Sequence, residues 1–317
     1  GNIVDAALIE KPADKDTYEE HSLNVNDLFL DDIKLMVDDA GGRYLLSSFY
    51  STKKRGDIEG LYVYGFDKNT GKTAFEKTTL FDEDLKKRAK GRSGKNAFNN
   101  FFINNIIVNG DGSFTVASEA LYNTNDWDRW GYWGGWGPGW GWGGMDMGMW
   151  GGWGPGWGWG WGRWGGWWPY SYYSPFFYRS YWWGGWGPGW GGGPGGGNSQ
   201  QFNAGNIAVF SFDAQGNKTW DNVIVKSQSE NNTDGSISYQ VLPGSNGTVF
   251  LMNNSGKISD LENIMITNDG TIRKGPPIKA PEKRLDFMPK YGKQTGPAEL
   301  IIPYSYKRNI SFAKVEL

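Results

Sequence analysis

Histidine and cysteine, two side chains that often carry out acid–base or metal chemistry, are scarce or absent in this chain. It has 317 residues, one histidine, His21, and no cysteine. A Ser-His-Asp triad or a histidine-based zinc site needs a histidine beside particular partners, and the polar segment around His21 offers no such arrangement. The absence of cysteine excludes disulfides, thiolate metal ligands and cysteine nucleophiles. We therefore interpret His21 as a solvated loop residue and predict no catalytic residue.

Two pairs of neighbouring carboxylates remain as candidates for chemistry, Asp31-Asp32 and Asp38-Asp39. Paired acids can hydrolyse glycosidic bonds when one donates a proton and the other attacks or activates water. The plainer interpretation, which we favour, is that the pairs cap a short helix and a turn. The sequence contains neither a Gly-x-Ser-x-Gly nucleophile elbow nor a phosphate-binding Gly-x-x-x-x-Gly-Lys-Ser/Thr loop, so neither of these enzyme classes is indicated.

Oxygen-rich turns at residues 67–71 and 109–112 contain the ligand types that calcium prefers. Neither turn completes an EF-hand loop with its closing glutamate. Aspartate, asparagine and glycine are also the residues that tight hairpin turns require. We therefore predict no metal site and no bound cofactor.

The most unusual feature is the distribution of tryptophan. Of the 19 tryptophans, all but Trp220 lie between residues 127 and 190, embedded in glycine. The element Trp-Gly-Gly-Trp-Gly-Pro-Gly-Trp-Gly occurs three times there, starting at Trp133, Trp150 and Trp183. Glycine maximises backbone freedom and proline lacks an amide donor, so this block can form neither a continuous helix nor a central strand. Its indoles must stack on one another, lie on a partner or stay loose.

Four interpretations of this block compete: a disordered loop, a protein–protein or self-assembly surface, a membrane-interface anchor, and a glycan-binding platform. Disordered segments are usually poor in aromatic residues, and exposed apolar patches usually mark interfaces. Trp-Gly pairs allow close ring stacking, and an arginine such as Arg163 can lie over an indole face. We favour protein–protein or self-assembly contacts. The predicted partner-binding residues are Trp133, Trp136, Trp140, Trp150, Trp153, Trp157, Trp183, Trp186, Trp190 and Arg163.

The charge balance argues against nucleic acid as the partner. The 32 Lys and Arg residues are matched by 34 Asp and Glu residues, which gives a formal net charge of -2. The basic run at residues 86–95 is most simply a solvated loop. No apolar run is long enough for a transmembrane helix, which needs about 18 residues or more. The chain starts at Gly1 without an initiator methionine, so we expect a processed product or part of a longer polypeptide.

Outside the tryptophan block the chain has the pattern of antiparallel β-meanders. Short β-branched and aromatic runs are separated by Asn-Gly, Asp-Gly and Gly-Ser turns. Their recurrence predicts a radial or stacked all-β array. Only two short helices are expected, around residues 25–34 and 82–90. The predicted strands are 42–51, 60–67, 72–79, 103–108, 113–121, 205–213, 218–226, 237–241, 247–253, 261–266, 298–304 and 310–315.

Two segments support a comparison with a known family. Residues 60–75 and 205–220 each contain a strand, an aspartate, a glycine-containing turn and a second strand with an aromatic residue. This pattern resembles the blade hairpins of quinoprotein-like β-propellers. The resemblance implies that Trp220 packs between neighbouring blades, with Phe75 as its substitute in the first hairpin. The alanine that usually precedes the aspartate in that family is missing, so no quinone-type cofactor is implied.

The resemblance also has implications for the number of blades and for the location of the protein. About three and a half blade-like units are visible, whereas closed propellers have 4–8 blades. Blades are therefore expected upstream of Gly1 or from a partner chain. Chains of this kind occur among secreted and envelope proteins of Gram-negative bacteria, which implies an extracytoplasmic location.

These observations predict an all-β, propeller-like fold of meander repeats with a long Gly/Trp-rich irregular insertion. Residues 1–24 form an N-terminal extension, 25–125 and 201–317 the two parts of the β-repeat region, and 126–200 the insertion. We predict a non-enzymatic structural or interaction protein of the bacterial envelope or cell exterior, with a protein partner or a second copy bound through the insertion. The alternatives are a glycan-binding or hydrolase-associated module that uses the aromatic platform, and anchoring at a membrane interface.

Overall fold

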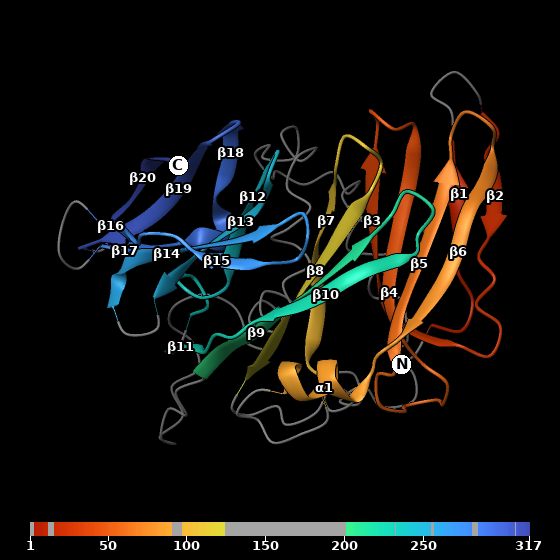
Figure 1. Ribbon diagram of the computed structural model, residues 1–317, viewed down its shortest axis with the longest axis horizontal. Helices are drawn as coiled ribbons and strands as arrows, with labels where there is room; N and C mark the ends of the chain where they lie inside the picture. Colours follow the sequence, from red (N-terminus) through yellow and green to blue (C-terminus); the bar gives the residue numbers. More distant parts are fainter. Residues whose placement is uncertain are drawn as a thin grey trace, which may run out of the picture. The chain divides into compact units, whose positions relative to one another are not determined.

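A two-stranded N-terminal sheet and four larger antiparallel sheets follow one another along the chain in the computed structural model of this protein (Figure 1). The residues that the structure describes are 3–11, 16–90, 97–123, 201–231, 233–254, 257–280, 285–307 and 309–317. The predicted all-β class is confirmed, because these residues form antiparallel strands and one α-helix. The strands of the described residues form no closed barrel and no closed propeller.

The first sheet is a four-stranded meander preceded by an N-terminal hairpin. The hairpin pairs β1 (Ala7–Glu10) with β2 (Glu19–Ser22). The strands of the first sheet are β3 (Phe29–Asp38), β4 (Arg43–Ser51), β5 (Gly60–Asp67) and β6 (Lys72–Leu80), in that spatial order. The segment predicted as an N-terminal extension therefore contains a folded hairpin.

The helix expected around residues 25–34 is wrong, because most of this segment belongs to β3. β3 pairs with β4 from Phe29 opposite Ser51 to Asp38 opposite Arg43. The register shifts between Leu30 and Ile33, so Asp31 and Asp32 lie in a β-bulge and do not cap a helix. A local pattern of mixed polar and apolar residues is ambiguous, and pairing with the neighbouring strand decides the outcome.

The second sheet carries the tryptophan block between its two inner strands. The one described α-helix, α1 (Glu83–Ala89), precedes it and confirms the helix predicted around residues 82–90. The strand order is β10-β9-β8-β7, and β11 pairs with the first part of β9. The strands are β7 (Phe101–Val108), β8 (Phe114–Asn123), β9 (Gln201–Phe212), β10 (Lys218–Ile224) and β11 (Gln228–Asn231).

The third and fourth sheets continue the meander pattern. In the third sheet β16 pairs with β14 beside the path β12-β13-β14-β15. In the fourth sheet β19 has β17 and β18 along one edge and β20 along the other. The strands are β12 (Tyr239–Gly244), β13 (Gly247–Asn254), β14 (Lys257–Thr267), β15 (Ile272–Lys274), β16 (Ile278–Lys279), β17 (Asp286–Phe287), β18 (Lys293–Gly296), β19 (Glu299–Tyr306) and β20 (Asn309–Glu316), with a 3-10 turn at Pro289–Tyr291.

The hydrophobic core lies in layers between successive sheets. One cluster joins the first and second sheets and includes Leu61 of the first and Phe210 of the second. A second cluster joins the second and third sheets, and a third joins the third and fourth. On its other face the first sheet buries Tyr62 and Tyr64 with Leu8 of the N-terminal hairpin. Strands covered on both faces read as nearly continuous apolar runs, which explains the composition of β5 and β9.

Two aromatic side chains interlock neighbouring sheets in the same way. A Cβ atom placed on Gly216, in the turn of the second sheet, would lie 2.5 Å from the ring of Phe75 of the first sheet. A Cβ atom on Gly270, in the turn of the third sheet, would lie 2.8 Å from the indole of Trp220 of the second sheet. Both glycines have positive φ, which favours glycine for a second reason. Phe75 and Trp220 thus occupy equivalent positions, each against the turn of the following sheet.

Candidate functional site

The tryptophan block is inserted at the end of a continuous hairpin stem. β8 and β9 are paired from Phe114 opposite Phe212 to Asn123 opposite Phe202 (Figure 1). Residues 124–200 therefore connect the ends of two hydrogen-bonded neighbours within one sheet. The predicted partner-binding tryptophans and Arg163 lie outside the described residues. The structure does describe the root of the insertion. We define the root as the C-terminal end of β8 and the N-terminal end of β9, with the strands and side chains packed around them.

A β-bulge shapes this root. Between Glu119 and Leu121 of β8, the opposite strand β9 has one extra residue, and Gly205 lies close to Ala120. The side-chain amide of Asn206 donates a hydrogen bond to the carbonyl oxygen of Ala89 at 3.2 Å. Its oxygen accepts the backbone N–H of Lys226 at 3.1 Å. The bulge thus turns Asn206 into a cap for the end of α1, since the last carbonyls of a helix lack partners within the helix.

A buried ion pair lies next to the bulge. The Nζ atom of Lys226 is 2.5 Å from Oε1 of Glu119, and the two side chains are 3% and 0% exposed. Burial lowers the pKa of Lys226, and the neighbouring carboxylate of Glu119 opposes that effect. The hydroxyl of Ser238 donates to Oε2 of Glu119 at 2.5 Å, and Asn104 donates to the same oxygen at 3.2 Å. Such a pair is tolerated in the interior only because its members are paired and hydrogen-bonded.

The ion pair belongs to a network that joins three sheets. Lys226 also donates to Oε1 of Gln228 at 2.7 Å, and the amide of Gln228 donates to the carbonyl of Asn253 at 2.7 Å. Asn253 in turn donates to the carbonyl of Phe287 at 2.6 Å. Ser238 has a φ of 78°, a conformation that a non-glycine residue keeps only where its surroundings impose it. The root of the insertion is therefore fixed to the third and fourth sheets by buried polar contacts.

This arrangement fits a structural role better than a catalytic one. The carboxylate of Glu119 is already engaged by Lys226, Ser238 and Asn104, and no histidine lies in the network. Within the described ranges, no group of three or more His, Asp or Glu side chains is placed to hold a metal ion. No helix in this part of the chain has the length and apolar character needed to cross a membrane.

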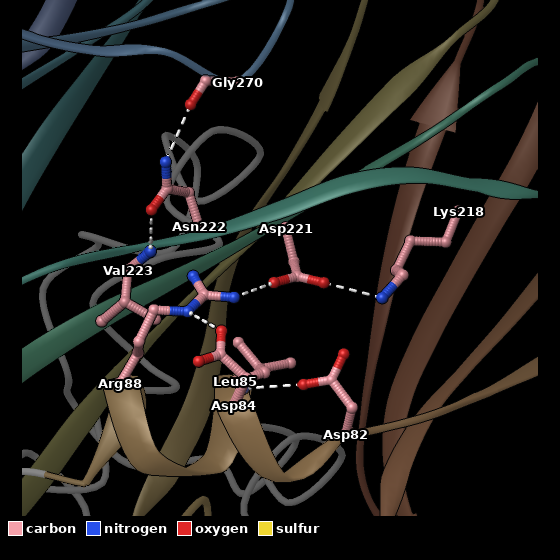
Figure 2. A network of polar contacts seen from close by, with 9 residues as sticks. All are labelled: Asp82, Asp84, Leu85, Arg88, Lys218, Asp221, Asn222, Val223 and Gly270. Atoms are coloured by element: carbon pink, nitrogen blue, oxygen red, sulfur yellow. Dashed lines mark hydrogen bonds and ion pairs between the residues drawn. The ribbon is translucent and has the colours of Figure 1, made fainter.

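A second polar network lies on β10 and ties it to α1 (Figure 2). Asp221 accepts from Arg88 of α1 at 2.7 Å and from Lys218 at 2.7 Å. Arg88 also pairs with Asp84 at 2.8 Å. Burial raises the pKa of Asp221, but the hydrogen bonds from Lys218 and Arg88 outweigh it, so its pKa lies below the usual range. The first part of the basic run 86–95 is thus helical, which corrects its interpretation as a loop.

The other residues considered for chemistry have local structural roles. His21 lies on β2, and its ring packs 4.3 Å from that of Phe66, so the prediction of a solvated loop is wrong. Asp38 accepts the N–H of Gly41 at 2.9 Å and pairs with Arg43, as expected of a turn residue. In the turn after β5, Asp67 accepts the N–H of Asn69 at 2.8 Å. These oxygens stabilise turns through the backbone, as in other hairpins.

Glu119, Lys226 and Ser238 were not among the candidates taken from the sequence. One signal for Glu119 was present, because a charged residue interrupts an otherwise apolar strand at a position that alternation places on a buried face. Its partner Lys226 is more than one hundred positions along the chain, in the loop between β10 and β11, so no local sequence pattern indicates the pair. Compared with known proteins, the chain matches no family model and no curated protein sequence.

Proposed function

We propose that this protein is a non-enzymatic docking or assembly protein in which stacked β-sheets hold the Gly/Trp-rich insertion, residues 126–200, on a rigid stem. The observation that carries the proposal is the pairing of β8 and β9, which resumes after the bulge and extends to Asn123 opposite Phe202. An insertion at the end of two inner strands interrupts no sheet. The scaffold and the tryptophan-rich element can therefore have separate tasks.

The buried polar network supports the same division of tasks. Glu119 is four residues from the end of β8, and Lys226 follows β10, so their ion pair fixes the base of the stem. A docking element works best when its base is held in one orientation, because less entropy is then lost on binding. Tryptophan and arginine are also the residues that most often dominate the binding energy of protein interfaces.

The finer description of the scaffold is part of the proposal. Four successive meanders, with Phe75 and Trp220 at equivalent sheet junctions, support a partial propeller-like array. The resemblance of residues 60–75 and 205–220 to quinoprotein-like blade hairpins supports a place in the bacterial envelope or outside the cell. We also propose that a protein partner or a second copy binds through the insertion.

The test is to replace residues 126–197 with a short Gly-Ser linker and compare the native mass of the two proteins. We expect the shortened protein to keep its β-sheet circular dichroism and to lose its assembly or partner. A matched variant keeps the length and glycines of the block and changes Trp133, Trp150 and Trp183 to Ala. If the shortened protein still co-purifies with the same partners, the docking role is wrong.

Two further measurements separate the alternatives. Retention on a polysaccharide affinity gel that is lost in Trp136→Ala and Trp157→Ala would favour glycan binding over protein docking. An assembly that is present without detergent and becomes a detergent-bound monomer when detergent is added would favour a membrane interface. A mass that is independent of detergent and falls on deletion of the block supports protein–protein assembly.

A further inference from the structure

The fourth sheet has an outer face that is apolar and exposed. Along β19 and β20, the side chains of Leu300, Ile302 and Val315 are buried against the third sheet. The alternating residues point the other way, because successive residues of a strand face opposite sides. Among them Ile310 and Phe312 are 67% and 68% exposed. We call this surface the outer face; it is formed by Ile301, Pro303, Ser305, Ile310, Phe312 and Lys314.

The outer face continues a repeated pattern of the molecule. Among the described residues, the second and third sheets bury apolar side chains on both faces, each against another sheet. The first sheet packs on the second with one face and is covered by Leu8, Leu23 and Val25 on the other. The outer face of the fourth sheet has an apolar centre without such a cover, where Phe312 lies opposite Pro303 and Ile310 lies opposite Ser305.

We propose that the outer face packs against the same face of a second copy of this chain, related by a two-fold axis. A head-to-tail continuation of the sheet stacking would require the outer face of the first sheet, and the N-terminal segment already covers that face. A two-fold contact requires only that the surface be complementary to itself, which is the usual arrangement in homodimers. Two sheets packed face to face in this way extend the stacking seen between the sheets of one chain.

The charges on the outer face are compatible with self-association. Lys314 is paired with Glu299 at 2.9 Å and with Glu316 at 2.8 Å. The cation is therefore matched by carboxylates of its own chain, and two copies do not bring unmatched positive charges together. Like charges facing each other would oppose association, so this local balance favours a two-fold contact.

Site-specific cross-linking tests the proposal in the full chain, because the protein has no cysteine of its own. Ser305→Cys places a thiol on the outer face, and Thr78→Cys places one on the exposed edge strand β6 as the matched control. With a short bismaleimide reagent, we expect a covalent dimer from Ser305→Cys and none from Thr78→Cys. Equal cross-linking of both variants, or of neither, would overturn the proposal.

A second substitution, added to Ser305→Cys, tests whether residues of the outer face make the dimer contact. Phe312→Lys, added to Ser305→Cys, should weaken dimerisation by about 30-fold or more, the loss expected when one central anchor residue is removed. Ile310→Lys serves as an independent second variant, and Val225→Lys, at another exposed apolar residue, should change nothing. Circular dichroism checks that each variant is folded. Cross-linking that is unchanged in both Phe312→Lys and Ile310→Lys contradicts the proposal.

One further variant separates dimerisation through the outer face from docking through the insertion. Changing Trp133, Trp150 and Trp183 to Ala in the Ser305→Cys chain should leave the covalent dimer in place. If the dimer disappears in that variant, the copies meet through the insertion, and the outer face is not the contact.

Discussion

The two polar networks around the second sheet contain similar groups in very different surroundings. Glu119 and Lys226 are 0% and 3% exposed, whereas the Arg88 that pairs with Asp221 is 37% exposed. The distances are alike, 2.5 Å and 2.7 Å. Water screens the second network and not the first, so the free energy lost when a partner is removed should differ several-fold. Distance alone therefore says little about how strongly an ion pair determines stability.

The largest effect is expected for Glu119→Ala. The substitution leaves the ammonium of Lys226 buried without a counter-charge, and we expect the free energy of unfolding to fall by about 3–5 kcal/mol. Urea denaturation followed by circular dichroism measures the change. The double variant Glu119→Leu with Lys226→Met removes both charges, and at least half of the lost stability should return. A single variant within about 1 kcal/mol of wild type would show that the pair is effectively solvated.

An intermediate effect is expected for Gly270→Ala, at the junction next to the Asp221 network. Gly270 has a φ of 86° and contacts the indole of Trp220, so the methyl group meets both backbone strain and a ring. We expect a loss of about 1–3 kcal/mol in thermal or urea unfolding. Gly71→Ala is the control, because Gly71 has a φ of 65° and no atom within 4 Å of an added Cβ. Equal losses in the two variants would mean that the indole contact contributes nothing.

The smallest effect is expected for Asp221→Asn, at about 0.5–1 kcal/mol, because Arg88 and Lys218 are partly exposed. Asp84→Asn, which removes the more exposed partner of Arg88, should lie nearer zero. These measurements belong at low and high salt, since screening should shrink the difference. A loss above about 3 kcal/mol would place this network in the same class as the buried pair.

The stability difference between wild type and Asp221→Asn should depend on pH in the acid range. The folded-state pKa of Asp221 is below its usual value, so its contribution to stability is present above about pH 4, the ordinary aspartate range. That contribution is lost as the pH falls through the folded-state pKa. The stability difference between wild type and Asp221→Asn should therefore shrink towards zero as the pH is lowered from 5 to about 2. A difference that stays constant over this range would contradict the assignment.

Much of the β-structure could be predicted from the sequence. The strands at residues 113–121 and 205–213 were recognised as parts of one meander across the insertion, because turn residues and β-branched runs recur at regular intervals. The expected position of Trp220 came from the resemblance to propeller blade hairpins and not from this regularity. Strand β3 could not be predicted in this way, because its hydrophobic pattern is compatible with a helix until β4 pairs with it.

The polar network at the root of the insertion could not be predicted from the sequence. Glu119 and Lys226 are 107 positions apart, and Lys226 lies in the loop between β10 and β11, so no local pattern pairs them. A bulge shifts the register next to Glu119, between Glu119 and Leu121. The position of a bulge depends on close approach of backbones, here of Gly205 and Ala120, and has no reliable local pattern. The hairpin in residues 1–24 was missed for a related reason, since its short strands are mostly exposed and gain stability by packing on the first sheet.

Because the insertion lies between paired inner strands, a break in the polypeptide within residues 124–200 would leave all the strand pairings of the second sheet in place. The fragment before the break supplies β7 and β8 and the fragment after it supplies β9, β10 and β11, so neither can complete the five-stranded sheet alone. A nicked molecule should therefore run as a single species under native conditions and separate into two pieces only in denaturant.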